Sequence, residues 1–249
     1  MKKLILATGS DNRYLKKIER YLNSIEINSN FDYNFLIYLG DENIKLNYKK
    51  IKVTNVSPLD YKNKNSINCL QHGEFLKSKE FSEFTNDDDV IFYTDGDMIL
   101  QRLLSEDELI NFRCLKDGDV FVGYNQSPND NLKNEYHRLL PTKNIPKEFN
   151  VDLSKIKCYN TGVIGATKKT FRDIERHYDL LYPKVDSMLR YYAKQQWLIS
   201  FIIGTMGFNI IEMGYNLHVH THYPIPNGAE KINDVVTYNG ETILFRHNW

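Results

Sequence analysis

The chain has 249 residues, of which 41% are hydrophobic and 26% are charged, enough for one large domain with its own core. Its 32 basic and 32 acidic residues give a formal net charge of +0, so no global charge signal indicates nucleic acid or an anionic membrane as a partner. Cys69, Cys114 and Cys158 are widely spaced, no leader pattern opens the chain, and no run approaches 18 apolar residues. We therefore expect a reduced, soluble, cytoplasmic protein without a membrane span.

The first hundred residues alternate between apolar runs and helical patterns. Residues 4–7 predict a buried strand, and Thr8, Gly9, Ser10 and Asp11 predict a turn after it. Apolar side chains recur at three- and four-residue spacing from residue 13 to residue 25, which predicts a helix. The other elements expected in this half are strands at 35–39 and 51–56 and a helix at 66–84. This order predicts an α/β fold, with a Rossmann-like, mixed but mostly parallel sheet flanked by helices.

Residues 88–100, DDVIFYTDGDMIL, carry the main chemical signal of this half. The apolar run at 90–93 predicts a strand buried on both faces, and Asp95 and Asp97 follow where that strand reaches the surface. Gly96 between them allows a ligand to approach the backbone closely. Two carboxylates in one place repel each other, a divalent cation relieves the repulsion, and such a cation keeps free positions for phosphate oxygens. A solvated turn is the alternative interpretation of this pattern.

The second half mixes helices, strands and one long polar stretch. We expect helices at 103–112, at 167–181 (stopped by Pro183) and at 187–203, and strands at 119–124, 158–166, 208–211 and 216–220. The pair Asn239-Gly240 predicts a β-hairpin within residues 235–245. Residues 127–149 are polar and contain three prolines, and we expect recognition of a substrate in this loop.

His218, His220 and His222 alternate along a predicted strand, which would place three imidazoles on one face. A hydrolytic metal site usually adds a carboxylate to such a row, and HVHTHY contains none. We therefore expect core or surface histidines here rather than a zinc site.

Four segments carry a resemblance to a known family: ILATGSDNRYLKKIERYLNSI, VIFYTDGDMIL, YNTGVIGA, and KQQWLIS followed by GYN. In this order, and spanning almost the whole chain, they resemble the GT-A glycosyltransferases, most closely the glycogenin-like and bacterial galactosyltransferase-like enzymes of family 8. The resemblance implies that Thr8, Asp11 and Tyr14 contact the nucleoside, and that Asn160 faces the donor sugar. It also places Gln195 and Gln196 beside the sugar, with Gln195 where the family usually has Asp.

The C-terminal segment LFRHNW is a further similarity. Family members bring a His near the C-terminus back to the metal as a third protein ligand, and His247 stands where that residue should. The family usually continues with Gly and Lys residues that grip the diphosphate, whereas this sequence ends at Trp249. We therefore expect Arg246, or another Lys or Arg, to contact the diphosphate, and we expect residues 246–249 to form a terminal tail.

These features together predict a metal-dependent glycosyltransferase that moves a sugar from a nucleotide-sugar donor, expected to be UDP-linked, to an acceptor hydroxyl. A divalent ion stabilises the departing diphosphate in such a reaction. Asp95, Asp97 and His247 are the expected metal ligands, and the imidazole favours Mn²⁺ over Mg²⁺. Lys77 and Lys79 are candidate phosphate contacts, or ordinary exposed helix lysines. The chain is expected to form one domain, with a nucleotide-binding half (1–100) and an acceptor-binding half (101–249).

The stereochemical course divides the catalytic candidates. An inverting enzyme needs a carboxylate base, for which Glu212 is the first candidate and Asp186 a second. The resemblance implies retention instead, with Gln196 or Gln195 beside the anomeric carbon, and retention is the expected outcome.

Two other classes remain open, a nucleotidyltransferase and a non-catalytic module that binds nucleotide sugars. A nucleotidyltransferase usually has a Gly-rich, basic N-terminal loop, and residues 8–11 have one glycine and no lysine. The acceptor also stays open: a glycan, a protein, a small molecule or a modified nucleobase.

Overall fold

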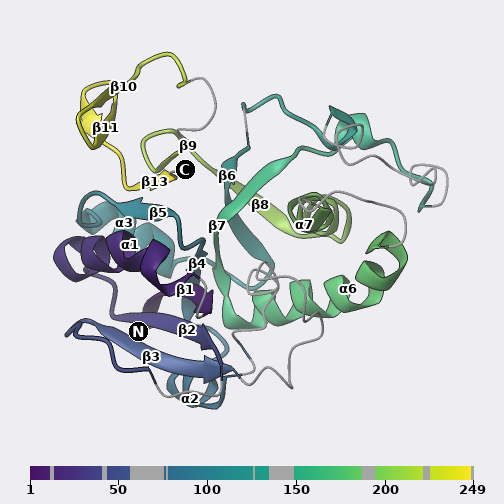
Figure 1. The fold of residues 1–249 in the computed structure, drawn as a ribbon. Helices are drawn as coiled ribbons and strands as arrows, with labels where there is room; N and C mark the ends of the chain where they lie inside the picture. The colour runs from purple at the N-terminus through teal and green to yellow at the C-terminus, as the bar shows by residue number, and fades with distance from the viewer. Residues whose placement is uncertain are drawn as a thin grey trace.

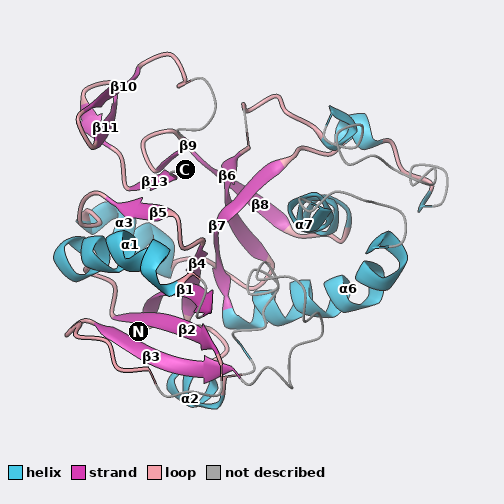
Figure 2. Cartoon of the chain, viewed as in Figure 1, coloured by secondary structure: helices cyan, strands magenta, loops and turns pink. Residues whose placement is uncertain are grey.

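The structure is a computed structural model of the chain, and it describes residues 1–11, 14–40, 44–56, 76, 78–125, 127–134, 149–186, 194–220 and 225–247. Strands and helices alternate along the chain, and one large sheet forms its centre (Figure 1, Figure 2). The strands of this sheet are β1 (Leu4–Asp11), β2 (Tyr33–Leu39), β3 (Ile51–Val56), β4 (Val90–Thr94), β6 (Asp119–Tyr124), β7 (Tyr159–Thr167) and β8 (Asn209–Met213). The helices are α1 (Leu15–Asn28), α2 (Lys79–Phe84), α3 (Glu106–Arg113), α6 (Lys168–Asp186) and α7 (Lys194–Thr205), and η4 (Leu153–Lys155) is a short 3-10 helix.

The seven strands lie in the order β3-β2-β1-β4-β7-β6-β8. β7 pairs antiparallel with β4 and with β6, and the other adjacent pairs are parallel. Six strands therefore end at one edge of the sheet, and β7 begins there. In open α/β sheets this carboxyl edge is where ligands bind. The expected α/β architecture, a mostly parallel sheet flanked by helices, is confirmed.

Both faces of the sheet are covered. Successive side chains of a strand point to opposite faces, and in the buried strands both sets are apolar. Leu4 and Leu6 of β1 belong to the core on the side of α1 and α3, whereas Ile5 and Ala7 belong to the core on the side of α2, α6 and α7. Figure 1 shows α1 and α3 on the opposite side of the sheet from α6 and α7. Two packed cores thus hold the carboxyl edge of the central strands rigid.

Two smaller sheets add the C-terminal part of the chain to this frame. β5 (Met98–Leu100), β13 (Phe245–His247) and β9 (His218–His220) form one of them, in the order β5-β13-β9. β10 (Ala229–Ile232), β11 (Val235–Tyr238) and β12 (Glu241–Thr242) form the other. The predicted hairpin is confirmed between β11 and β12, where Asn239 and Gly240 both have positive φ, 51° and 85°.

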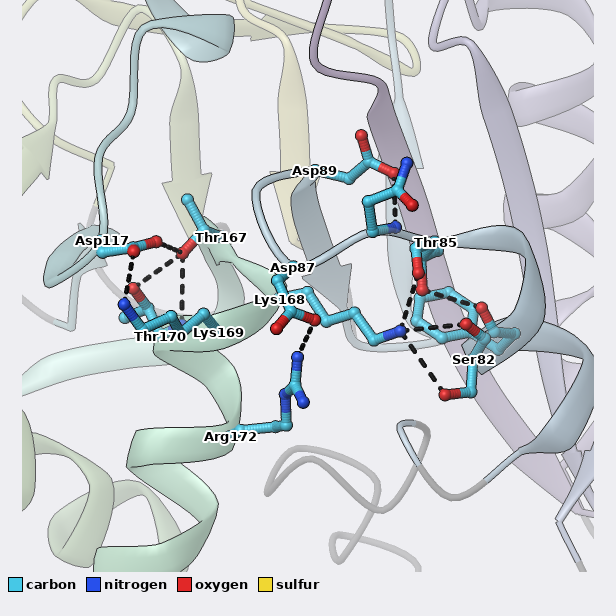
Figure 3. A network of polar contacts seen from close by, with 12 residues as sticks. Ser82, Thr85, Asp87, Asp89, Asp117, Thr167, Lys168, Lys169, Thr170 and Arg172 are labelled. Atoms are coloured by element: carbon cyan, nitrogen blue, oxygen red, sulfur yellow. Dashed lines mark hydrogen bonds and ion pairs between the residues drawn. The ribbon is translucent and has the colours of Figure 1, made fainter.

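A polar network closes the opposite edge of the large sheet (Figure 3). Lys168, at the start of α6, is buried and donates hydrogen bonds to the backbone carbonyls of Ser82 and Thr85 at 3.0 and 2.9 Å. The Asp89 carbonyl accepts from the Lys168 backbone N–H at 3.0 Å. Because Ser82 lies in α2 and Thr85 caps its C-terminal end, these contacts tie α2 to α6 away from the carboxyl edge.

The structure corrects several local expectations. Residues 8–11 continue β1 and do not form a turn, because Thr8 pairs with Thr94 and Asp11 with Leu39 in parallel ladders. Pro183 lies inside α6 and does not end it, since the helix continues to bury Val185 in the core. Residues 246 and 247 belong to a strand paired on both sides and not to a tail.

Other expectations fall partly or wholly on residues that the structure does not describe. Of the helix expected at 66–84, residues 76 and 78–84 are described, and 79–84 form α2; of the helix expected at 187–203, the described part lies in α7. Most of the loop at 127–149 lies outside the described residues. None of the helices in the described part of the chain combines the length and the apolar character needed to cross a bilayer.

Candidate metal centre

Asp95 and Asp97 directly follow β4 at the carboxyl edge of the sheet. The Asp95 backbone N–H donates a 2.8 Å hydrogen bond to the carbonyl of Gly162 in the neighbouring strand β7. Asp97 is the last residue before β5. The two carboxylates are thus held between a central strand of the large sheet and the first strand of a smaller one, and both remain partly exposed.

His247 reaches this place through the register of β13. β13 pairs antiparallel with β5, which sets His247 opposite Met98, and parallel with β9, which sets His247 opposite His220. His247 Nε2 consequently lies 3.2 Å from Asp97 Oδ1. Ligand atoms of Asp95, Asp97 and His247 all lie within 4.8 Å of one another.

The electrostatics of the cluster reflect its two carboxylates. Burial lowers the pKa of the His247 imidazole, but its hydrogen bond to Asp97 and the charges of Asp97 and Asp95 outweigh burial and raise that pKa above its ordinary value. Burial raises the pKa of the Tyr21 hydroxyl, and the same two carboxylates add to the rise. Tyr21 packs beneath the cluster with its hydroxyl 2.6 Å from Thr94 Oγ1. The centre is therefore a site of negative potential that favours a cation.

A glycine in β7 makes room for this arrangement. The pairing of β6 with β7 shifts register between Val122 and Gly123, so that Gly123 pairs with Asn160. The Gly162 backbone N–H donates to Asn160 Oδ1 at 2.8 Å. A Cβ at Gly162 would lie 2.5 Å from Cε1 of His247 and 2.7 Å from Asn160 Oδ1. A glycine at this point of the irregular strand thus leaves room for both the Asn160 side chain and the His247 ring.

The donor set fits a divalent ion. Two carboxylates and one imidazole offer oxygen and nitrogen ligands, a combination that suits Mn²⁺ better than Mg²⁺ and leaves coordination positions for other groups. Gly96 faces Ile18 of α1, where a Cβ would clash with the isoleucine side chain, so Gly96 fits the turn closely against the helix.

The residues expected to contact the nucleoside lie at the end of β1. Thr8 is buried, and its Oγ1 has no hydrogen-bond partner among the described residues. Asp11 accepts from the Tyr14 backbone N–H through its carbonyl at 3.1 Å and its Oδ1 at 3.2 Å, just before α1 begins. The Tyr14 side chain is partly exposed, and Lys17 Nζ lies 4.6 Å from its ring centroid. Asp11 lies at the same edge of the sheet as Asp95, since β1 and β4 are adjacent and parallel.

The two lysines proposed for phosphate contacts are less informative. Lys77 lies outside the described residues. Lys79 is 89% exposed at the start of α2 and forms a 3.9 Å ion pair with Glu83 one turn later.

Gln195 and Gln196 lie in the first turn of α7. Gln195 is buried, and Gln196 is partly buried and donates a 3.0 Å hydrogen bond from Nε2 to Asn125 Oδ1. Asn125 directly follows β6, so Gln196 also lies at the carboxyl edge.

Glu212 of β8 has three side-chain donors. Lys157 Nζ lies 2.5 Å from its Oε1, the Tyr159 hydroxyl donates to Oε1 at 3.3 Å, and the Tyr124 hydroxyl donates to Oε2 at 3.4 Å. Both phenols have a raised pKa, caused first by burial and then by the Glu212 charge. Asp186 ends α6, and the position of its side chain is not described.

Arg246 is nearly fully buried and turns away from the carboxylates. Successive side chains of a strand point to opposite faces, and Arg246 contacts the carbonyl and the carboxylate of Asp234, whereas His247 contacts Asp97. Asp234 also forms a 2.8 Å ion pair with Arg20 of α1. This placement gives no support to the expectation that Arg246 contacts a diphosphate at the cluster.

The histidine row of β9 lies beside the centre. His218 is buried against Gly123, where a Cβ would lie 2.5 Å from its Nδ1, and the ring centroids of His220 and His247 are 4.2 Å apart. Among the described residues, the group that can hold a metal ion contains His247 but neither His218 nor His220. His222 lies outside the described residues.

Several residues that contact the expected site residues escaped the sequence reasoning: Asn125, Asp130, Lys157 and Asp234. Asn125 had a usable signal, since a polar residue directly after a buried strand belongs to the carboxyl edge. Lys157 and Asp234 had none, because their partners Glu212 and Arg246 are distant in sequence.

The sequence matches no protein-family model and no curated protein. Solved structures do match the fold. The galactosyltransferase LgtC, in complex with donor and acceptor sugar analogues, superposes with a TM-score of 0.56 and 14% identity over 88% of this chain and 76% of LgtC. An active-site mutant of LgtC superposes with a TM-score of 0.56 and 12% identity over 88% of this chain and 75% of that one. Together with the sheet order, this similarity shows that the chain has the GT-A glycosyltransferase fold.

Proposed function

We propose that the protein is a divalent-metal-dependent glycosyltransferase that uses a nucleotide-sugar donor, expected to be UDP-linked, and that it is related to family 8. The observation that carries this proposal is the register of β13. It brings His247 to the two carboxylates after β4, so that three metal-binding side chains from distant parts of the chain meet at the carboxyl edge of a GT-A sheet.

Asp97 and His247, with Asp95, would hold the ion, with Mn²⁺ favoured over Mg²⁺. When bound there, a divalent ion supplies positive charge that stabilises a departing diphosphate. The chain's own contribution is to fix these side chains before a donor arrives. Asp95 is hydrogen-bonded through its backbone to β7, and His247 is held in a strand that is paired on both sides.

The adjacent parallel strands β1 and β4 support a division of labour along the edge. In our proposal, residues 1–100 bind the nucleotide through Thr8, Asp11 and Tyr14, and the diphosphate lies at Asp95 and Gly96. Residues 101–249 bind the donor sugar through Asn160, Gln195 and Gln196, and also the acceptor. Asn160 supports this order because its side chain and the His247 ring both lie beside Gly162, in the strand next to β4.

The contacts of Glu212 favour retention over inversion. A general base must be able to receive a proton from the acceptor, and Glu212 is already held by Lys157 and two phenols. Gln196 carries no charge and is a poor nucleophile, so we propose front-face attack, with the departing phosphate receiving the acceptor proton.

Thermal unfolding with UDP, GDP, CDP and ADP, each with and without Mn²⁺, tests the proposal, followed by assays of donor hydrolysis. We expect one diphosphate, UDP, to stabilise the protein strongly and only with Mn²⁺, and we expect slow hydrolysis of a UDP-sugar. Stabilisation without any hydrolysis or transfer would favour a non-catalytic binding module. Release of pyrophosphate from a nucleoside triphosphate and a sugar phosphate would identify a nucleotidyltransferase instead.

A further inference from the structure

A chain of three polar side chains runs inward from Gln196. Gln196 Nε2 donates to Asn125 Oδ1 at 3.0 Å, and Asn125 Nδ2 donates to Asp130 Oδ2 at 3.0 Å. The other oxygen of the carboxylate, Asp130 Oδ1, accepts from the Asn131 backbone N–H at 3.0 Å. Asn125 and Asp130 are buried, with 4% and 8% of their surfaces exposed, so the contact between them is shielded from water.

The Asp130 carboxylate, at the inner end of these three side chains, determines which group donates and which accepts in each hydrogen bond. A carboxylate accepts hydrogen bonds and has no proton to donate, so Asn125 must turn its amide nitrogen toward Asp130. Its Nδ2 also lies 3.8 Å from Cys158 Sγ, a further acceptor. The Asn125 oxygen therefore faces Gln196, which must present its amide nitrogen to it because an amide oxygen cannot donate. The chemistry of Asp130 thus sets the orientations of both amides.

Gln196, the outer of the three residues, lies at the carboxyl edge of the sheet, where the proposed function places the donor sugar. Asn125 follows β6, and two strand spacings separate β6 from β4, or about 10 Å at about 4.8 Å per spacing. With its nitrogen bound to Asn125, Gln196 directs its carbonyl oxygen away from Asn125. An amide oxygen carries partial negative charge, which favours the positive charge that develops on an anomeric carbon as the leaving group departs.

We propose that Asp130 is a positioning residue, acting through Asn125 to hold the Gln196 amide with its carbonyl oxygen toward the donor sugar. The catalytic meaning of this orientation rests on the proposed function. The orientation itself is a property of the folded chain, and it is tested without substrate.

A double-mutant cycle in the free protein tests the donor–acceptor order of the hydrogen bonds that link Gln196, Asn125 and Asp130. Gln196→Glu replaces the donor by an acceptor and sets two oxygens against each other, so we expect a lower unfolding temperature at neutral pH. Asp130→Asn supplies a donor at the inner end and lets the Asn125 amide turn over and donate to position 196. The loss in the double variant should therefore be smaller than the sum of the two single losses, and additive losses would overturn the proposal.

Charge alone could also couple the two positions, and Asp130→Ala controls for it. This substitution removes the same charge as Asp130→Asn but supplies no donor for the Asn125 oxygen. We expect Asp130→Asn to compensate Gln196→Glu more strongly than Asp130→Ala does, each measured against its own single variant. Equal compensation by the two substitutions would mean that charge alone couples the two positions, and it would overturn the proposed role of the hydrogen bonds through Asn125.

A second measurement needs only Gln196→Glu and so does not depend on the folding of the Asp130 variants. A carboxyl facing the Asn125 oxygen is stabilised by protonation, which raises its pKa in the folded state, so its stability deficit relative to the unsubstituted protein should shrink between about pH 7.5 and about pH 5. A deficit that is independent of pH would overturn the assigned orientation.

The kinetic arm applies once a donor is identified. Asp130→Asn should lower kcat by up to about 100-fold through misplacement of Gln196, while Mn²⁺-dependent binding of UDP stays within about twofold. If the stability cycle succeeds but no nucleotide binds, the role of the hydrogen bonds through Asn125 stands and the proposed function fails. Loss of UDP binding together with kcat would instead show a general structural role for Asp130.

Discussion

His247 Nε2 lies 3.2 Å from Oδ1 of Asp97, although the two residues belong to opposite halves of the chain. The pairing of His247 with Met98, the residue after Asp97, produces this contact. Because β13 also pairs with β9, backbone hydrogen bonds on both sides fix the imidazole. An imidazole held in this way would lose little conformational freedom on binding a metal, which would favour affinity.

Asp97→Asn should abolish Mn²⁺-dependent donor hydrolysis, because it removes a charged ligand while keeping the shape of the side chain. Asp97 is partly exposed, so we expect the variant to remain folded without metal. Asp173→Asn, a partly exposed carboxylate on α6, is the matched control and should keep full activity. Hydrolysis by Asp97→Asn at the unsubstituted rate, in the presence of EDTA, would refute the metal assignment.

The stability of the metal-free protein should depend on His247. The pKa of this imidazole is raised above its ordinary value of 6.5, so its contribution to stability is fully present below about pH 6.5 and is lost as pH rises through the folded-state pKa. His247→Gln should remove this decline when unfolding is followed in EDTA from about pH 6 to about pH 9.

Mn²⁺ should reverse the trend, because a metal binds the neutral imidazole and competes with its proton. Mn²⁺ affinity is therefore expected to increase with pH over the same range. An affinity that is flat with pH in the unsubstituted protein would speak against His247 as a ligand.

Gly162→Ala should disturb the candidate metal centre by displacing a neighbouring side chain. The new methyl group would lie 2.5 Å from the His247 ring and 2.7 Å from Asn160 Oδ1, so one of them must move. We expect a loss of about 1–3 kcal/mol in unfolding free energy and a clear loss of Mn²⁺ affinity in calorimetric titration.

Gly165→Ala is the matched control for that variant, three residues along the same strand. Its methyl group would lie 2.8 Å from the Phe92 ring, which is remote from the carboxylates in the packed core. We expect a similar loss of stability with Mn²⁺ affinity unchanged. Equal losses of affinity in both variants would show that Gly162 acts through general stability alone.

Much of the large sheet was predictable because its strands are short segments rich in apolar and β-branched residues. The strands expected at 51–56 and 119–124 have those bounds in the structure. The short strands were not predictable in the same way. β5 and β13 have three residues each, and their pairing with β9 depends on contacts between distant segments that no local pattern encodes.

The same distinction applies to the candidate site: a local sequence pattern predicted some of its residues, and others depend on contacts between distant segments. Asp95 and Asp97 were predictable from the end of a buried strand, and the proximity of His247 came from a resemblance, which the register of β13 supports. Arg246 was expected beside a diphosphate from its position in the sequence, but strand alternation turns it toward Asp234. The hydrogen-bonded pair Asn125–Asp130 was missed because its role depends on α7, far along the chain.

The stereochemical course gives the sharpest test of the catalytic residues. We expect the anomeric configuration of the donor to be retained, with Gln196→Ala losing more rate than Glu212→Gln. Gln196 is held at the carboxyl edge by Asn125, whereas Glu212 would have to break its contact with Lys157 to act as a base. Proton NMR of the first-formed product, recorded before mutarotation, decides the question. A product of opposite configuration, together with inactivity of Glu212→Gln, would make Glu212 the base and would require Lys157 to release it on substrate binding.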